Sequence, residues 1–443
     1  MTAPASPREA ALRTLAACRT RGAWADAALP SQLSGLSGPD AALCSRIVYG
    51  VTQNRMLLDF YLAAYCSQKP DHLQPPLLDI LRIGAYQILF LDKVPDSAAV
   101  NTSVELAKKA GRGQASGLVN AVLRKIAQNK EHLPPVPQRD EVQCLSICYS
   151  HPKWLVKRLL ALLGREGTEA LLAVHNSQPP AAAQVNTLKT GGEALLESLR
   201  AAGAAAEPHP WLPDCLLLTG AGNLERLEPF RAGAFYIQDP AARLAALAAD
   251  LSPGCRVLDV CAAPGGKSFA AAIAMGDKGQ VLACDLHENK LKRIREGAAR
   301  LGISCIETAA ADGRVMHEAW RDGFDAVLVD APCSGLGIIR KKPDIRYKRP
   351  DDLFTLPVAQ SAILANASGY VRPGGTLVYS TCTLLPEENQ QVTDTFLAEH
   401  PDFSRESFVL PGPLGKTEGQ ITLWPHCHGT DGFYICRMRR RAT

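Results

Sequence analysis

The stretch from Val257 to Ser268 constrains the fold of this chain more than any other. Val257-Leu258-Asp259-Val260 is typical of a short buried strand. A turn containing Pro264, Gly265 and Gly266 follows, and then an Ala-rich run that predicts a helix. In an open α/β sheet, ligands bind where such a strand ends and its helix begins, because glycines and free helix N–H groups approach them there. A single glycine turn, however, is also what an ordinary strand–turn–helix contains.

Later strand-like runs place acids and cysteines at corresponding positions. The run 281–285 ends in Asp285, and an acid at the tip of a second strand can accept both ribose hydroxyls of an adenosine group. The run 326–329 ends in Asp330-Ala331-Pro332-Cys333-Ser334-Gly335, and the next ends in Ser380-Thr381-Cys382. Two strands of one predicted sheet therefore bring a cysteine each to the edge that carries the glycine turn.

Three motifs, in this order, resemble those of S-adenosylmethionine-dependent RNA (cytosine-5) methyltransferases: the glycine turn 261–267, the Asp-Ala-Pro-Cys-Ser-Gly run and the Ser-Thr-Cys run. None of the three would be specific alone. The resemblance implies that S-adenosylmethionine is the cofactor. Asp285 would hold its ribose, Asp312 would accept from its adenine amino group, and Asp330 would close its methionine side. The loop residues expected to contact the cofactor are Cys261, Ala262, Ala263, Pro264, Gly265, Gly266 and Lys267. Each acid taken singly could equally be a turn or cap residue.

The chemistry of this family requires a reactive thiol. Carbon 5 of cytosine is a poor nucleophile until a thiolate adds to carbon 6, which divides one difficult step into two easier ones. Related DNA enzymes use the cysteine of a Pro-Cys pair, here Cys333, whereas the RNA family uses the cysteine after Ser/Thr, here Cys382. We therefore expect Cys382 to be the nucleophile, Cys333 to assist product release and Asp330 to contact the base. Because a free thiol has a pKa of about 8.5, the site must favour the thiolate, and Lys267 could supply positive potential.

Residues 1–130 predict a helical bundle. Apolar residues recur at helical spacing, as in 77–88 and 119–126, and Gly and Pro clusters mark the breaks. The arrangement also resembles the NusB-like RNA-binding domain, at 46–50, 81–87 and 119–124. The resemblance implies docking on structured RNA. The alternative is a packing module for the catalytic half.

The rest of the chain divides into three further parts. Residues 131–144 contain a Pro-rich run that predicts a linker. Residues 145–234 mix helix and strand and are similar to the small ferredoxin-like, α+β insert of the family, which is expected to help bind RNA. Residues 235–443 alternate strand and helix, which predicts a mostly parallel doubly wound sheet. The family implies a Rossmann-like class I methyltransferase domain whose last strand, near 433–438, runs antiparallel.

A basic segment follows Cys333. Arg340, Lys341, Lys342 and Arg346 lie in a run with a single acid, with Tyr347 among them. Such a run is usually a solvated face. Beside a reactive cysteine, we interpret it as an RNA phosphate-binding loop with a ring for stacking.

Composition sets broad limits. The net charge of +4 neither requires nor excludes nucleic acid, and no apolar run approaches the ~18 residues of a transmembrane helix. The chain has 14 cysteines and is far too long to need disulfides, which fits a reducing cytoplasm. Cys144 and Cys148 have no second ligand pair at zinc spacing, so no metal is expected. We expect a cytoplasmic monomer that does not bind membranes.

The leading hypothesis is a bacterial enzyme that methylates carbon 5 of a specific cytosine in 16S rRNA. An enzyme acting on tRNA or another rRNA is the alternative with the same chemistry. A catalytically silent, cofactor-binding ribosome assembly factor is a third interpretation, which the presence of both cysteines disfavours. A small-molecule methyltransferase would need neither the helical front domain nor the basic segment.

Overall fold

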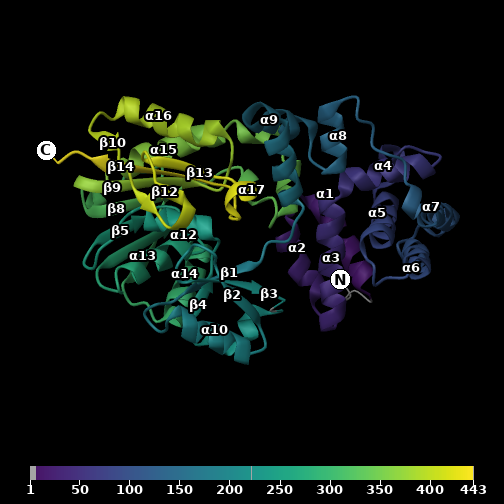
Figure 1. The fold of residues 1–443 in the computed structure, drawn as a ribbon, viewed down its shortest axis with the longest axis horizontal. Coiled ribbons are helices and arrows are strands. Elements are labelled where there is room, and N and C mark those ends of the chain that lie inside the picture. The colour runs from purple at the N-terminus through teal and green to yellow at the C-terminus, as the bar shows by residue number, and fades with distance from the viewer. Residues whose placement is uncertain (1–5, 221, 443) are drawn as a thin grey trace. The chain divides into compact units, whose positions relative to one another are not determined.

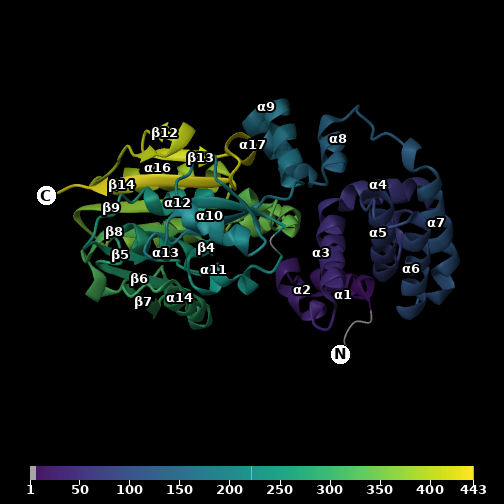
Figure 2. The same ribbon diagram turned by 60° about the horizontal axis from the view of Figure 1, so that its bottom comes forward.

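The expected strand–helix alternation is present in the computed structural model, which describes residues 6–220 and 222–442. The strands that form its large sheet are β5 (Arg256–Asp259), β6 (Gln280–Asp285), β7 (Ile306–Ala310), β8 (Phe324–Asp330), β9 (Val371–Thr381), β10 (Phe403–Arg405), β13 (Gln420–Leu423) and β14 (Phe433–Arg440). Their order is β10-β14-β9-β8-β5-β6-β7, with β13 beside β14. Figure 2 shows the strands from β14 to β7 in this order. Neighbours from β9 to β7 are parallel. β14 runs antiparallel to β9, as the family resemblance implied. The parallel order places the ends of β5, β6, β7 and β8 at one edge.

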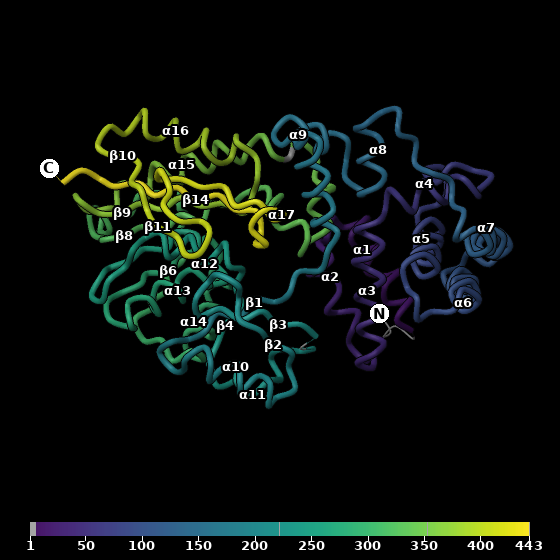
Figure 3. The backbone as a smooth tube through the Cα atoms, in the orientation of Figure 1, coloured from purple at the N-terminus to yellow at the C-terminus, as the bar shows by residue number. Residues whose placement is uncertain are grey.

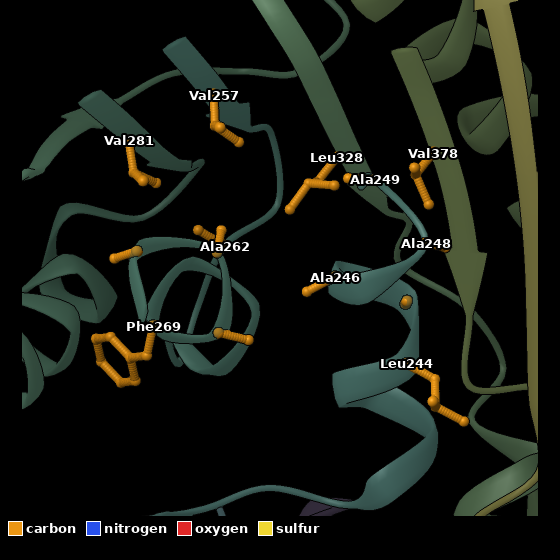
Figure 4. Packing of buried hydrophobic residues seen from close by; sticks show 14 of the residues in the cluster. Leu244, Ala246, Ala248, Ala249, Val257, Ala262, Phe269, Val281, Leu328 and Val378 are labelled. Atoms are coloured by element: carbon orange, nitrogen blue, oxygen red, sulfur yellow. The ribbon is translucent and has the colours of Figure 1, made fainter. Parts of the chain in front are cut away.

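Helices cover both faces of this sheet. The helices α12 (Pro240–Leu247), α13 (Gly266–Ala274) and α14 (Glu288–Leu301) pack on one face, and α15 (Leu356–Ser368) and α16 (Gln390–Glu399) on the other (Figure 1). Side chains of β8 point alternately to the two faces of the sheet. Ala326 and Leu328 pack in the core under α12, α13 and α14, whereas Val327 and Val329 pack in the core under α15 and α16. Figure 4 shows Leu328 and Val257 on the side of Phe269 and α12. Each fully buried Val or Leu contributes about 1.5–3 kcal/mol, so the sheet edge is held by a rigid core.

Residues 399–432 contain short elements that the sequence pattern did not predict. Beside β10 and β13, these are β11 (Val409–Leu410), β12 (Gly415–Lys416) and α17 (Pro425–His428). Runs of two to four residues are too short to show the hydrophobic periodicity by which strands and helices are recognised. The strand β13 is stabilised by its pairing with β14, which is distant information for a local pattern.

The small insert is an antiparallel sheet with helices. It contains β1 (Ala181–Val185), α10 (Gly192–Ala201), β2 (Ala205–Pro208), β3 (Cys215–Thr219), α11 (Glu228–Arg231) and β4 (Phe235–Ile237). The strand order is β2-β3-β1-β4, and every pair is antiparallel. Leu195 and Leu199 of α10 lie in one core with Val185 and Phe235. This confirms the expected α+β subdomain.

The N-terminal part is all helical, as expected. Within the expected range 1–130 its helices are α1 (Pro7–Arg21), α2 (Ala25–Leu33), α3 (Gly38–Gln53), α4 (Arg55–Tyr65), α5 (Pro75–Phe90), α6 (Asp96–Lys109) and α7 (Ser116–Gln128). Two more helices, α8 (Glu141–Cys148) and α9 (Lys153–His175), lie where the sequence predicted the linker and the start of the insert. The neighbouring helices α5, α6 and α7 pack on one another (Figure 3). Their apolar residues, among them Ile80, Leu106 and Val122, share one core. Within the described residues, no helix is long and apolar enough to cross a membrane.

The first compact unit extends further than residue 130, where the bundle was expected to end. It runs to Ser177, because α8 packs on α4 and α9 packs on α8. It also includes Ile339–Lys348, a segment that lies in sequence between β8 and α15. The second unit consists of Gln178–Ile338 and Arg349–Thr443, and contains both the insert and the large sheet.

Candidate active site

The loop after β5 has the close-packed geometry that its glycines suggested. Gly265 has a φ of 109°, and a Cβ there would lie 2.7 Å from the ring of Phe269. No other residue type fits this position without strain. The Ala262 N–H donates to the carbonyl of Cys284, which ties the loop to the end of β6, and α13 begins at Gly266. The loop therefore lies at the carboxyl edge of the sheet.

A cavity of about 700 Å³ opens beside this loop. It is lined by Cys261, Ala262, Ala263, Pro264, Gly266 and Lys267, together with Asp330, Cys382, Tyr236, Gln238 and Phe433. The glycine loop, Asp330 and Cys382 therefore line the same cavity. Asp285 and Asp312 are not among the described residues that line it.

Asp330 lines the cavity and is held by two neighbouring side chains. Its Oδ2 lies 2.7 Å from Nζ of Lys267, and its Oδ1 accepts from the hydroxyl of Ser380 at 3.0 Å. Lys267 is only 8% exposed, and its Nζ lies 4.9 Å from the centre of the Phe433 ring. The buried lysine charge is therefore directed at Asp330, whose own side chain is 30% exposed and lines the cavity.

The two cysteines meet. The Sγ atoms of Cys333 and Cys382 are 3.2 Å apart, although 49 residues separate them in sequence. Adjacent parallel strands β8 and β9 bring them together, and the Gly337 N–H donates to the carbonyl of Cys382. A Cβ at Gly337 would lie 1.9 Å from the carbonyl oxygen of Gly432, so the loop after Cys333 can approach this closely only with glycine. Hydrogen bonding with Cys382, followed by burial, raises the pKa of Cys333 well above its usual value.

Asp285 and Asp312 follow neighbouring strands of the same edge. Asp285 is 8% exposed, ends β6 and accepts from the His287 N–H, while Lys290 lies 3.3 Å from its Oδ1. Asp312 follows β7 and binds the Arg314 guanidinium through both oxygens. These hydrogen bonds from Arg314 lower the pKa of Asp312 to about 2.

A further acid, Asp259, is fully buried at the end of β5. Its Oδ2 accepts from the Ser268 hydroxyl at 2.7 Å, and its Oδ1 has no partner among the described residues. Burial raises the pKa of Asp259 to about 7. Asp259 was not among the predicted site residues, although its position at the end of the first strand was a signal.

Arg346 was expected to bind RNA phosphate, and the structure contradicts this. It is 0% exposed, and its guanidinium donates to the carbonyls of Gln53, Tyr149 and His175 and to Oδ1 of Asn176. Both terminal nitrogens of the guanidinium bond inside the first unit, and Nε is buried without a partner among the described residues, so no donor is accessible to a phosphate.

Tyr347, expected to stack on a base, is also occupied. Its ring lies 3.4 Å from the Arg55 guanidinium, and its hydroxyl donates to the Thr52 carbonyl. The remaining basic residues differ in exposure: Arg340 is 8% exposed, whereas Lys341 and Lys342 are exposed. Lys342 pairs with Asp26 at 2.7 Å.

Comparison with known families and relatives agrees with this architecture along the whole chain. Residues 246–439 match the family described as 16S rRNA methyltransferase RsmB/F. Residues 5–128 match the NusB family, and residues 151–225 match the ferredoxin-like domain of RsmF/B-like methyltransferases. A protein of Bacillus subtilis named "Probable ribosomal RNA small subunit methyltransferase B" is 38% identical, covering 98% of this chain and 99% of its own.

This chain belongs to the RsmB/F family of 16S rRNA methyltransferases. "Ribosomal RNA small subunit methyltransferase B" of Pseudomonas putida is 36% identical over 98% of both chains. Among solved structures, that of PH0851 aligns with a TM-score of 0.81 at 27% identity, covering 99% of this chain and 100% of its own. The RsmB/F chain described here is therefore an rRNA methyltransferase with a NusB region, a ferredoxin-like insert and a catalytic α/β domain.

Proposed function

We propose that this RsmB/F-family enzyme transfers a methyl group from S-adenosylmethionine to carbon 5 of a cytosine in 16S rRNA, with Cys382 as the nucleophile. The observation that supports this most is the pair of thiols 3.2 Å apart beside the glycine loop. Of the two, Cys382 lines the cavity, so it is the sulfur placed to meet a base there. A base within structured RNA must first leave its stack to enter such a space.

The Cys382 thiolate forms a bond to carbon 6 of the cytosine, and the displaced electron pair makes carbon 5 nucleophilic. S-adenosylmethionine, when bound, would supply the methyl group to carbon 5 and would leave as S-adenosylhomocysteine. A base, which we propose to be Cys333, then takes the carbon 5 proton; the electrons of that C–H bond restore the ring double bond, and the bond between Sγ and carbon 6 breaks to return the Cys382 thiolate. Asp330, held by Lys267 and Ser380, would contact the edge of the base throughout.

Cys333 fits the release role because its protonation depends on Cys382. Hydrogen bonding with Cys382 is the largest cause of its raised pKa. A thiolate with a raised pKa is a correspondingly strong base, and at 3.2 Å from the Cys382 sulfur, Cys333 would take the carbon 5 proton of the adduct.

The residues of the cavity, together with the acids at the strand ends beyond it, suit an adenosine-bearing, cationic cofactor. A volume of about 700 Å³ lies within the usual range of small-molecule sites. The loop 261–267 would approach the cofactor through its backbone, and Asp330 provides a carboxylate for its positive end. Asp285 and Asp312, at the ends of the next strands, would bind the ribose and the adenine. We also propose Lys341 and Lys342, which are exposed, as contacts for the RNA backbone.

The decisive experiment is bisulfite sequencing of rRNA from cells with and without this protein. We expect one cytosine of 16S rRNA to lose its methyl group in the deletion strain and to regain it with the wild-type gene. Cys382→Ala should not restore it. Unchanged 16S rRNA methylation in the deletion strain, or restoration by Cys382→Ala, would overturn the proposal.

A further inference from the structure

Glu388 lies between the two loops that carry the cysteines, and the chemistry above gives it no role. It belongs to the short turn Pro386–Glu388 before α16 and is 1% exposed. Its Oε2 accepts from the N–H of Ser334 at 2.8 Å, and its Oε1 accepts from the hydroxyl of Thr383 at 3.2 Å. Ser334 follows Cys333 and Thr383 follows Cys382. One carboxylate therefore binds the residue after each cysteine.

Other side chains complete this network around Cys333. Gln360 of α15 donates through one Nε2 both to Oε2 of Glu388 and to the carbonyl of Pro332, each at 3.0 Å. The hydroxyls of Ser334 and Thr383 are 2.6 Å apart. The residues on both sides of Cys333 are thus fixed, and the second of them is joined directly to the other cysteine loop.

The loop that carries Cys382 is fixed in the same way by Asn389, the residue after Glu388. Asn389 accepts from the hydroxyl of Thr381 at 2.5 Å and donates to the carbonyl of Thr383 at 3.1 Å. The Tyr379 hydroxyl donates to the Glu388 carbonyl at 2.7 Å, which attaches the turn to β9. All these atoms are buried, so the loops cannot move without breaking hydrogen bonds that water would not replace.

A buried carboxylate is a costly way to fill a turn. Removing it from water costs several kcal/mol unless converging donors compensate. Bonds to an ionised acceptor are shorter and stronger than neutral ones, which makes a carboxylate an effective bridge between two loops. Its charge also acts on the site: hydrogen bonding with Cys382 and burial raise the pKa of Cys333, and Glu388 adds to this.

We propose that Glu388 is a positioning residue that holds the two cysteine loops together, so that both thiols can act on one base. It touches neither sulfur and acts through Ser334 and Thr383. Its catalytic consequence rests on the proposed function, whereas its effect on the distance between the thiols does not.

The first test measures thiol proximity without RNA or cofactor. Diamide accepts two electrons and two protons from a pair of thiols and leaves a disulfide, so its rate of coupling Cys333 to Cys382 reports how often the sulfurs meet. The coupled peptide is quantified by mass spectrometry. We expect Glu388→Ala to slow coupling about tenfold, because disulfide geometry tolerates little displacement. Glu388→Gln should stay within about threefold of wild type, since its amide oxygen accepts from Ser334 and its amino group can donate to the Thr383 hydroxyl. Glu399→Ala, an exposed glutamate at the end of α16, is the control.

The second test separates positioning from simple destabilisation. In methyl-transfer assays on 16S rRNA, Glu388→Ala should lower kcat about 100-fold, since a displacement of about 1 Å can cost that much. It should leave KM for S-adenosylmethionine unchanged, and Glu388→Gln should restore most of kcat. If Glu388→Ala is not recovered folded, Glu388→Asp replaces it, because its shorter side chain cannot reach both loops. Coupling at the wild-type rate in Glu388→Ala or Glu388→Asp would overturn the proposal. The two proposals can also fail separately. If the Glu388 variants couple slowly but the wild-type enzyme forms no methylcytosine, the positioning role of Glu388 is supported and the proposed function is refuted.

Discussion

The sulfurs of Cys333 and Cys382 lie 3.2 Å apart, within hydrogen-bonding distance of each other. Cys382 directly follows β9 and Cys333 lies in the loop after β8, its parallel neighbour, so the sheet and this loop together bring the two sulfurs close. A single nucleophile needs no second thiol beside it. The arrangement therefore suggests a reaction in which one sulfur binds the base and the other acts later.

Replacing Cys333 by Ala should trap the reaction after the covalent step. Cys382 can still add to the base, but the release that we assign to Cys333 is lost. We expect a protein–RNA adduct that survives denaturing gel electrophoresis and carries labelled methyl groups. The double variant that also has Cys382→Ala should form none. If Cys333→Ala turns over normally without an adduct, the release role is wrong.

Lys267→Met should lower turnover by about 100-fold, the usual cost of losing one preorganised electrostatic contact. The substitution keeps most of the side-chain volume but removes the ion pair that holds Asp330. Initial rates with saturating RNA would measure the effect. Lys292→Met, an exposed lysine of α14 paired with Glu296, is the matched control. Equal rates in the two variants would show that the charge of Lys267 has no catalytic effect.

Asp259 should make the protein less stable as pH rises. Its pKa in the folded protein is about 7, against an ordinary value of 3.8. Between these values the folded protein keeps a proton that the unfolded chain has lost, so the free energy of unfolding falls through this window. Above pH 7 the loss levels off, and the shift corresponds to about 4 kcal/mol. Urea unfolding from pH 3.5 to 8.5 would measure it. Asp259→Asn should flatten the profile, and an unchanged slope would contradict this.

Arg346→Ala should destabilise the first unit by about 3–5 kcal/mol, because it leaves buried acceptors without their donor. Those acceptors include the carbonyls of Gln53 and Tyr149. Thermal unfolding of the full-length protein would record the loss. Lys341→Ala, at an exposed position of the same segment, should leave the melting temperature unchanged and weaken RNA binding instead. A melting temperature unaltered by Arg346→Ala would be inconsistent with the observed hydrogen bonds.

The parts of the site that sequence could predict follow from short-range patterns. Apart from Asp259, the run 257–260 is apolar because a parallel strand is buried on both faces, and similar apolar runs mark β6, β8 and β9. The rule that parallel strands end at one edge then places Cys333 and Cys382 near the glycine loop. The approach of the two sulfurs to 3.2 Å is a finer result, which depends on the register of β8 against β9.

Other residues could not be assigned because their partners are distant in sequence. Arg346 bonds to Gln53, 293 residues earlier, and nothing in a run of basic residues distinguishes the buried arginine from the exposed lysines. Glu388 ends the short turn Pro386–Glu388, and α16 begins only at Gln390. Its role in the structure depends on Ser334, 54 residues away. The closely spaced acids soon after Cys382 were the only local signal.

The position of Ile339–Lys348 has a consequence for how this enzyme can be dissected. The chain leaves the second unit after Cys333, contributes this segment to the first, and then returns. No single cleavage point yields two intact halves. A fragment beginning at Gln178 would expose the guanidinium of Arg346 to water. A fragment ending at Ser177 would lack Arg346, and the backbone carbonyls that accept from it would lose their donor. Separate expression of the two units requires that the segment Ile339–Lys348 be fused to the first unit or supplied to it as a peptide.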